Sequence, residues 1–371
     1  MATARARQTK GAGLDLWVLG PVLALMTLGL VMVLSSSAIQ AERVFGREYY
    51  YFARQLVYAL LGTGLMYLAW RVPINLIYRL VYVWLLLAVV LLLLTLTPAG
   101  TGAGGANRWL DLGVVTLQPL ELAKVAVVLY LAYFFSQKQD KIKTFSIGFL
   151  PPVLVTLVIG GILLMQPDFG GAVFITALFF LLSLTGGTRL IYLFSSGLLC
   201  AGAGTLMILN SPYRLERWTA FLHPFQNAES IGYQLVQSLY GLGNGGMFGV
   251  GLGEGKQKLF FLPEAHTDFI LSVVGEELGF LGLSAVFILF GVFMFRSLHI
   301  SLMQQDLQSR FTVLGLSLVV LLEAFLNIAV VIGASPPTGV PMPFISYGGS
   351  NLIAMCLCCG LILNIGTRRG G

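Results

Sequence analysis

Phe261-Leu-Pro-Glu-Ala-His-Thr-Asp-Phe-Ile270 marks the border between a long polar segment and an apolar one. It places Glu264, His266 and Asp268 within five residues, in a chain in which only 10% of residues are charged. A carboxylate at a membrane border loses part of its hydration, which costs free energy unless the group is used or paired. The residues leave two interpretations open. Either Asp268 is a general base, with Glu264 and His266 as helpers or structural partners, or Thr267 or Asp268 is simply the N-cap of the helix that follows.

The composition around this stretch predicts an all-α polytopic membrane protein. Hydrophobic residues make up 57% of the 371 positions, and one bilayer span needs about 20 apolar residues. We expect ten membrane-spanning helices, at 14–37, 53–70, 77–97, 118–136, 146–165, 169–186, 187–210, 267–295, 310–334 and 350–366. The sixth is short and flanked by glycine, so a broken or re-entrant helix is an alternative there.

Lys and Arg residues orient this bundle, because positive charge accumulates on the cytoplasmic side. With the N-terminus inside, thirteen of these residues fall on the inner side and eight on the outer side. Both termini are then cytoplasmic, and 211–266 forms a large extracytoplasmic loop between helices seven and eight. The net charge of +6 is therefore mostly a topology signal, and we expect no nucleic-acid partner.

Three segments on the outer side are too irregular in sequence to be continuous helices. They are 98–117, 211–266, and 335–349, which carries prolines at 336, 337, 341 and 343. Non-helical backbone at membrane depth occurs only where it is buried in protein or lines a wet cavity. We therefore expect the three segments to converge on one cavity. The glycine-rich run 241–253 allows either close backbone packing or exposed N–H groups for an anion.

Charged residues within or beside the spans are functional or paired by default. They are Glu121, Lys124, Asp168, Glu276, Glu277 and Glu323. Glu121 and Lys124 are three residues apart, so they can pair on one helix face, although Lys124 could also bind a substrate diphosphate. Asp168 follows Gln166-Pro167 and is expected to cap the sixth span. At least one of Glu276 and Glu277 should face the bundle interior.

The cysteines give no sign of a metal or disulfide site. All four, Cys200, Cys356, Cys358 and Cys359, lie in apolar spans, where small apolar packing is their ordinary role. No His and Cys cluster suggests a metal centre, and we predict none. The outer loops also lack the Ser-x-x-Lys motif of a transpeptidase, so any cross-linking of a product would require a partner.

Seven motifs in order resemble those of the SEDS family (shape, elongation, division, sporulation), the group of FtsW, RodA and SpoVE. The resemblance covers nearly the whole chain as a single membrane domain, 1–371. Its carriers are Gly105-Ala-Asn-Arg-Trp109, Gln118-Pro-Leu-Glu-Leu-Ala-Lys124, Gln166-Pro-Asp-Phe-Gly170, Gly232-Tyr-Gln-Leu-Val-Gln-Ser238, Leu262-Pro-Glu-Ala-His-Thr-Asp-Phe269, Gly275-Glu-Glu-Leu-Gly279 and Pro343-Phe-Ile-Ser-Tyr-Gly-Gly-Ser350. The Ser-Ser-Ser-Ala38 stretch and the Ala-Asn-Arg-Trp block look closer to the division members than to the elongation members. Leu120 departs from the small serine usual in the family.

The resemblance implies ten spans with the N-terminus inside, and polymerisation of lipid II into septal glycan strands on the outer face of the bacterial cytoplasmic membrane. It maps the essential acidic residue of the family onto Asp268 as candidate general base. The resemblance assigns the substrate-binding residues less specifically than Asp268. The candidates are Arg108, Trp109, Glu121, Lys124, Arg214, Arg217, Glu264, His266 and Ser346. Any divalent cation, Mg²⁺ or Mn²⁺, would have oxygen ligands and would be held partly by the diphosphate. The implied partners are lipid II, a monofunctional class B penicillin-binding transpeptidase and other divisome membrane proteins. The alternatives are a lipid II flippase, an elongation-type polymerase and a scaffold for the transpeptidase.

Overall fold

The computed structural model describes residues 13–103, 106–111, 113, 116–228, 232–263 and 265–367. Within these ranges, eight helical segments are long and apolar enough to cross a membrane. They are α1 (Leu16–Phe45), α5 (Pro119–Gln137), a π turn with α6 (Phe145–Met165), α7 (Phe169–Gly186), α8 (Leu190–Leu209), α11 (Ile270–Met303), α12 (Leu307–Val331) and α13 (Gly349–Thr367). Each overlaps one of the ten predicted spans.

The two remaining predicted spans are also helical, but one is not among the eight apolar segments although it is long enough, and the other is divided into two shorter helices. The segment 53–70 lies in α2 (Tyr50–Arg71). The segment 77–97 is divided between α3 (Ile74–Arg79) and α4 (Val81–Leu94), with a break at Leu80. The glycine-flanked sixth span is one continuous helix, α7, whose C-cap Gly187 has a left-handed φ of 89°. The broken-helix alternative is therefore wrong.

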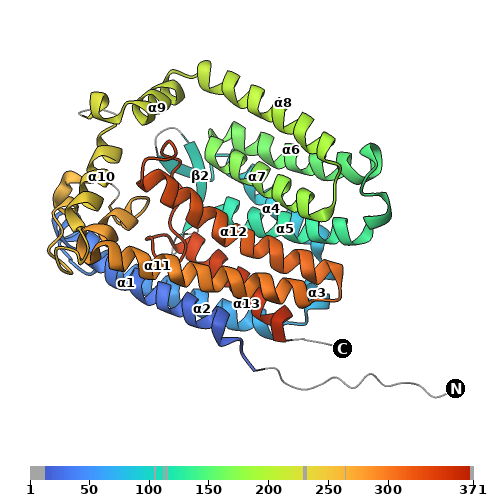
Figure 1. Cartoon of the computed structure of the whole chain (residues 1–371), viewed down its shortest axis with the longest axis horizontal. Coiled ribbons are helices and arrows are strands. Elements are labelled where there is room, and N and C mark those ends of the chain that lie inside the picture. The colour runs from blue at the N-terminus through green and yellow to red at the C-terminus, as the bar shows by residue number, and fades with distance from the viewer. Residues whose placement is uncertain are drawn as a thin grey trace.

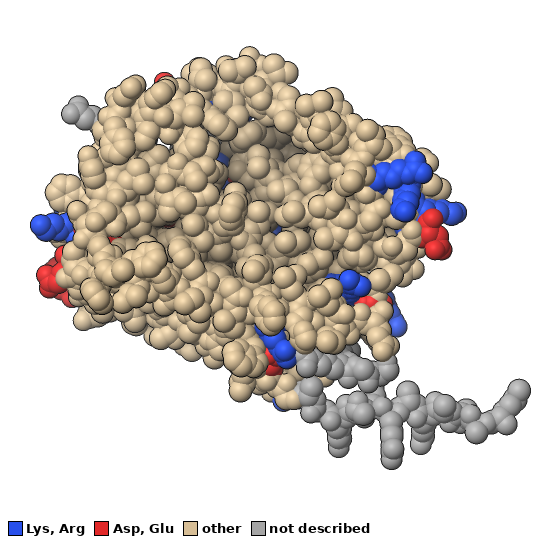
Figure 2. All heavy atoms as spheres, in the orientation of Figure 1, with Lys and Arg blue, Asp and Glu red and all other residues tan. Residues whose placement is uncertain are grey.

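The helices run side by side along the long axis of the molecule (Figure 1). α1 begins and α13 ends at one end of this bundle, while α9 and α10 lie at the other end (Figure 1). α5 and α13 form the interior, since 83% and 78% of their most apolar windows are buried. Only 6% of the corresponding window of α8 is buried. In Figure 2 the visible Lys, Arg, Asp and Glu side chains gather mainly at the two ends, and a broad band between them carries few. This pattern is typical of a bundle that crosses a bilayer.

The predicted span 267–295 corresponds to α11, which is broken at Gly279, where φ is 66° and ψ is −165°. The glycine-rich run supplies the reason. The N–H of Phe280 donates to the carbonyl of Gly246, and the N–H of Val250 donates to that of Glu276, both at 2.9 Å. Side chains at Gly245 or Gly249 would collide with the α11 backbone. The run therefore serves close backbone packing, the first of its two predicted uses.

The outer loops contain more regular structure than the sequence indicated. The 211–266 segment carries α9 (Pro212–Leu222), a 3₁₀ turn (Pro224–Asn227), α10 (Tyr233–Gly245) and a π turn (Gln257–Phe261). The 98–117 segment forms a small antiparallel sheet of β1 (Gly100–Ala103), β2 (Ala106–Asp111) and β3 (Thr116–Leu117), in the order β1-β2-β3. The all-α prediction is therefore incomplete, because the chain also forms this small sheet. Arg108 lies on its strand β2 and is positioned by it.

Candidate active site

The backbone around Asp268 is fixed by hydrogen bonds to three successive carbonyl oxygens, those of residues 266, 267 and 268. The donors come from α12 and from the proline-rich segment before α13. They are the Tyr347 N–H to His266 O at 2.9 Å, Ser346 Oγ to Thr267 O at 2.6 Å, and Asn327 Nδ2 to Asp268 O at 2.8 Å. Because all three bonds go to main-chain atoms, they hold the residue in place without engaging its carboxylate.

Asp268 itself lies just before α11 and is partly exposed. The N-cap position of α11 is Phe269, so neither Thr267 nor Asp268 is the N-cap residue and that alternative is wrong. The Oδ2 atom of Asp268 lies 3.6 Å from the point that a Cβ on Gly339 would occupy. Gly339 has a φ of 73°, which a residue with a side chain rarely adopts, so this approach depends on glycine.

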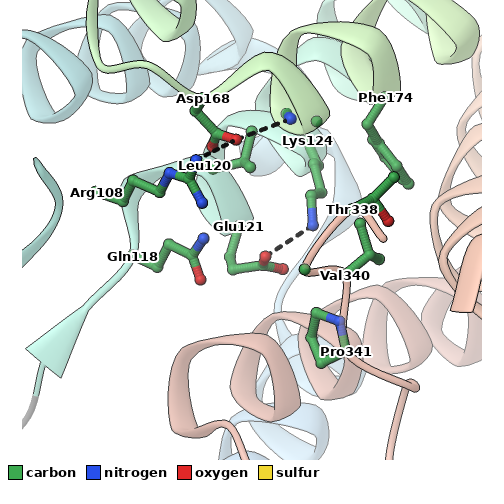
Figure 3. Close-up of a pocket in the computed structure, with 13 residues that line it drawn as sticks. Arg108, Gln118, Leu120, Glu121, Lys124, Asp168, Phe174, Thr338, Val340 and Pro341 are labelled. Atoms are coloured by element: carbon green, nitrogen blue, oxygen red, sulfur yellow. Dashed lines mark hydrogen bonds and ion pairs between the residues drawn. The ribbon is translucent and has the colours of Figure 1, made fainter. Parts of the chain in front are cut away.

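Gly339 also lines a small pocket of about 30 Å³, which opens between the small sheet, α5, α7 and the 338–341 segment. A volume of this size holds about two water molecules. Its lining includes Arg108, Gln118, Leu120, Glu121, Lys124, Asp168, Phe174, Thr338, Val340 and Pro341. Arg108 and the 338–341 segment lie on opposite sides of it (Figure 3). Of the three outer segments expected to converge on a cavity, 98–117 and 335–349 line this one.

Arg108 reaches across from β2 toward the start of α7. Its Nη2 donates to the carbonyl of Pro167 at 3.0 Å and lies 3.7 Å from Oδ1 of Asp168. Asp168 accepts the N–H of Gly171 at 3.1 Å as N-cap of α7, which confirms its predicted role. In the part of the chain that the structure describes, Nε of Arg108 and Oγ1 of Thr338 are buried without a hydrogen-bond partner. A pocket with unused polar groups and a guanidinium suits an anion with several oxygens.

The third outer segment borders the pocket through two arginines on α9. Arg217 donates to the carbonyl of Pro337, next to Thr338, at 3.2 Å. The guanidinium of Arg214 lies over the ring of Phe169, 5.2 Å from its centroid. Arg214 and Arg217 are both partly exposed, and neither lines the pocket. They therefore lie at its border, where they can turn toward a ligand larger than the pocket.

The predicted pairing of Glu121 with Lys124 is confirmed, with 2.7 Å between Lys124 Nζ and Glu121 Oε1. Lys124 also binds Glu323 on α12. Asn351 on α13 donates to both carboxylates, at 3.1 Å to Glu121 and 2.7 Å to Glu323. All four side chains are at most 5% exposed. The network joins α5, α12 and α13 directly beneath the pocket. Leu120, the departure from the family pattern, also lines the pocket.

Glu276 and Glu277 both face the interior, with 1% exposure each. Glu276 accepts the backbone N–H groups of Lys256 and Gln257, each at 3.1 Å. Glu277 binds Lys258 at 2.8 Å. These contacts fasten the outer loop to α11. The partner lysine was missed because it is 19 residues away in a loop and sequence spacing gave no signal for it.

His266 and Ser346 are both buried beside Asp268 and in contact with neighbouring segments. His266 is 5% exposed, and its ring lies 4.6 Å from that of Tyr51 and 5.7 Å from that of Tyr347. Burial raises the pKa of Tyr347 to about 12. Ser346 is 4% exposed, and its hydroxyl is occupied between Thr267 O and the Met342 N–H.

Trp109 and Glu264 are the last two of the predicted substrate-binding residues. Trp109 is partly exposed on β2, where its carbonyl accepts a bond from Thr101 at 3.4 Å. Glu264 lies outside the described residues. Within the ranges given above, no group of three or more His, Cys, Asp or Glu side chains is placed to hold a metal ion.

Several polar residues of the site were not predicted as site residues, among them Asn327 and Thr338. Asn327 did carry a signal, since it is a carboxamide in the middle of an apolar span. Thr338 lies within the irregular 335–349 segment, and nothing in its local sequence distinguishes it from its neighbours.

Comparison with known proteins agrees with the resemblance seen in the motifs. The family described as "Cell cycle protein" (FtsW, RodA, SpoVE) matches residues 16–370. The probable peptidoglycan glycosyltransferase FtsW of Trichlorobacter lovleyi is 43% identical over 352 residues, which is 95% of this chain and 92% of the relative.

Solved structures match the chain over nearly its whole length. A chain of a peptidoglycan synthase complex superposes with a TM-score of 0.80 at 28% identity, covering 96% of this chain and 98% of the other. The crystal structure of RodA from Thermus thermophilus gives a TM-score of 0.71 at 27% identity, covering 96% and 97%. With its apolar helices, the chain is a multi-pass membrane protein, and it belongs to the FtsW/RodA/SpoVE family.

Proposed function

We propose that this protein is a peptidoglycan glycosyltransferase that polymerises lipid II into glycan strands during septal cell-wall synthesis. In this proposal residues 1–371 form one membrane domain of ten helices with both termini in the cytoplasm. The 211–266 loop and the pocket then lie on the outer face of the bacterial cytoplasmic membrane. Support comes from the helix pattern, from the family and from the excess of Lys and Arg on the inner side.

One observation carries the assignment of the site: a carboxylate whose backbone is held at three successive carbonyls stands beside a pocket in which Nε of Arg108 and Oγ1 of Thr338 have no partner among the described residues. A glycosyl transfer from a lipid diphosphate needs these two elements together. A base takes a proton from the attacking hydroxyl, and fixed positive charge stabilises the leaving group.

The proposed reaction follows from this arrangement. The 4-hydroxyl of the acceptor GlcNAc attacks the anomeric carbon of the donor MurNAc, and its proton passes to Asp268. The bond from that carbon to the undecaprenyl diphosphate breaks as the new C–O bond forms, and the diphosphate leaves with the electron pair. Asp268 acts late, because a sugar hydroxyl becomes acidic only as the new bond develops.

Arg108 is the main candidate for binding the diphosphate, because a guanidinium can hold two phosphate oxygens at once. Arg214 and Arg217 reach the same region from α9 and would extend the contact along the lipid-linked substrate. We assign Lys124 and Glu121 to the support beneath the pocket, since each is already bonded within the network.

The remaining candidates take supporting or peripheral roles. We propose that His266 and Ser346 position the Asp268 segment, and that Trp109 covers a sugar or polyprenyl face or anchors the sheet at the membrane interface. Glu264 balances charge near the base in this scheme. Any divalent cation would be bound by the diphosphate oxygens and one or two carboxylates, as is usual for Mg²⁺.

The proposed partner is a monofunctional class B penicillin-binding transpeptidase, together with other divisome membrane proteins. Support comes from the peptidoglycan synthase complex that contains a chain similar to this one. A division role at the septum is favoured over elongation by the name of the 43% identical relative.

Incubation of the purified protein with labelled lipid II, alone and with such a transpeptidase, tests the function. A ladder of glycan strands is expected. Movement of lipid II across a bilayer without a ladder would instead identify a flippase. Neither activity, with the transpeptidase still bound, would leave a scaffold and refute the proposal.

A further inference from the structure

Asn327 on α12 joins the two backbone segments that form the Asp268 side of the pocket. Its Nδ2 donates one hydrogen bond to the carbonyl of Asp268 and another to the carbonyl of Val340, each at 2.8 Å. Val340 lines the pocket, next to Gly339. A single amide group therefore sets the distance between the candidate base and the pocket wall that faces Arg108.

The carboxamide of Asn327 lies in an environment that is energetically unfavourable for a polar group. Asn327 is 1% exposed within an apolar helix, where a carboxamide is unfavourable unless its polar atoms are bonded. Both of its N–H groups are used, and its Oδ1 is buried without a partner among the residues described. The reverse orientation would direct Oδ1 at two carbonyl oxygens, so the direction of the amide is determined by the site backbone.

We propose that Asn327 is a positioning residue for the glycosyl transfer, and that it holds Asp268 at the correct distance from the 338–341 wall. This inference rests on the proposed function. Without the amide, Asp268 O and Val340 O lose their common donor and the two segments separate. Displacement of a reacting group by about 1 Å can lower a rate by about 100-fold. Substrate binding through Arg108 should change little.

The chain contains a matched control for the chemistry of this residue. Asn364 on α13 is also 1% exposed. It donates to two backbone carbonyls, those of Ala69 at 2.7 Å and Val72 at 2.6 Å, and its Oδ1 is likewise buried and unpaired in the described structure. These carbonyls belong to the end of α2 and not to the pocket. The two asparagines thus differ in what they hold and not in how they are buried or bonded.

The experiment compares full-length Asn327→Ala and Asn364→Ala with the wild type. Both variants should lose similar thermal stability. Asn327→Ala should lower kcat for glycan polymerisation by about 10- to 100-fold, with KM within about twofold, whereas Asn364→Ala keeps kcat near the wild-type value. Equal losses of kcat in the two variants, in proportion to stability, would overturn the inference.

Hydrogen exchange of the unliganded proteins provides a readout that does not depend on the reaction. Peptides covering 265–269 and 336–342 should exchange faster in Asn327→Ala and at the wild-type rate in Asn364→Ala. Unchanged exchange would overturn the positioning role even if activity falls. A wild-type protein that makes no glycan would refute the proposed function, while exchange would still decide the role of Asn327.

If Asn327→Ala does not fold, Asn327→Gln serves as the second variant. It keeps both N–H donors on a side chain one methylene longer, so it should fold and shift the two segments relative to each other. The expected result is an intermediate loss of kcat with normal stability. Wild-type kcat and exchange in Asn327→Gln would contradict the proposal.

Discussion

The two sides of the pocket are built differently. On the Asp268 side, the backbone of 266–268 is held by Tyr347, Ser346 and Asn327, which belong to α12 and to the segment before α13. On the other side, cationic groups stand on a three-stranded sheet and on α9, which follows the lightly packed α8. A base must lie within a fraction of an ångström of its proton, whereas arginines on long side chains can follow a diphosphate as it enters.

The same contrast appears in the burial of the helices. In α12, which carries Asn327, and in α13, 61% and 78% of the apolar window are buried, against 6% in α8. Substitutions on the packed side should therefore affect folding and turnover, and substitutions on the arginine side should affect mainly substrate binding.

Lys124→Met should have the largest effect on stability. It leaves the carboxylates of Glu121 and Glu323 buried without their cation, and removal of one partner from a buried ion pair costs about 3–5 kcal/mol. We expect loss of most folded protein, measured as the monodisperse fraction in detergent and the apparent Tm. Lys138→Met removes an exposed lysine just after α5 and should leave both values unchanged. A stable Lys124→Met protein would show that the network beneath the pocket is dispensable.

Arg108→Ala should have the next largest effect, on substrate use rather than on folding. A hydrogen bond to a charged group contributes about 1.5–3 kcal/mol, which corresponds to a drop of about 10- to 100-fold in kcat/KM. The loss should appear chiefly as a raised apparent KM for lipid II, with little change in Tm. Arg47→Ala, at an exposed position before α2, is the control. An unchanged KM would remove Arg108 from the site.

Arg214→Ala and Arg217→Ala should have the smallest effects. Both side chains are partly exposed, and exposed ion pairs contribute about 0.2–1 kcal/mol. Each variant should raise the apparent KM by less than about fivefold. The fold increase in apparent KM of the double variant should approach the product of the two single increases. Glu216→Ala, on the exposed part of α9, should be neutral. A loss of folding in either variant would show that the arginine side is as rigid as the Asp268 side.

The sequence was most informative where one local rule acts alone. Asp168 was expected to be a cap because it follows Gln166-Pro167, and Glu121 and Lys124 were expected to pair from their spacing. The break at Gly279 was missed because it depends on backbone contacts with a run 30 residues earlier. Lys258 and Glu277 come together for the same long-range reason.

The site was predicted less completely than the helices. Motifs located Asp268 and Arg108, but not the amide of Asn327, because its two acceptors lie in different segments of the chain. The N-cap interpretation of Asp268 failed because α11 starts two residues later, at Ile270. Apolar periodicity does not define a helix boundary with that accuracy.

The central claim is that the carboxylate of Asp268 is the general base. The most direct measurement is the rate of glycan polymerisation by Asp268→Asn at saturating lipid II, relative to the wild type and to Asp111→Asn on β2. Asn has nearly the same size as Asp, and the bond from Asn327 to the main-chain carbonyl of residue 268 is kept, so the substitution should leave the fold and partner binding intact. The predicted result is a fall of about 10²- to 10⁴-fold with no change in Asp111→Asn. Glycan strands formed by Asp268→Asn at close to the wild-type rate would contradict the claim.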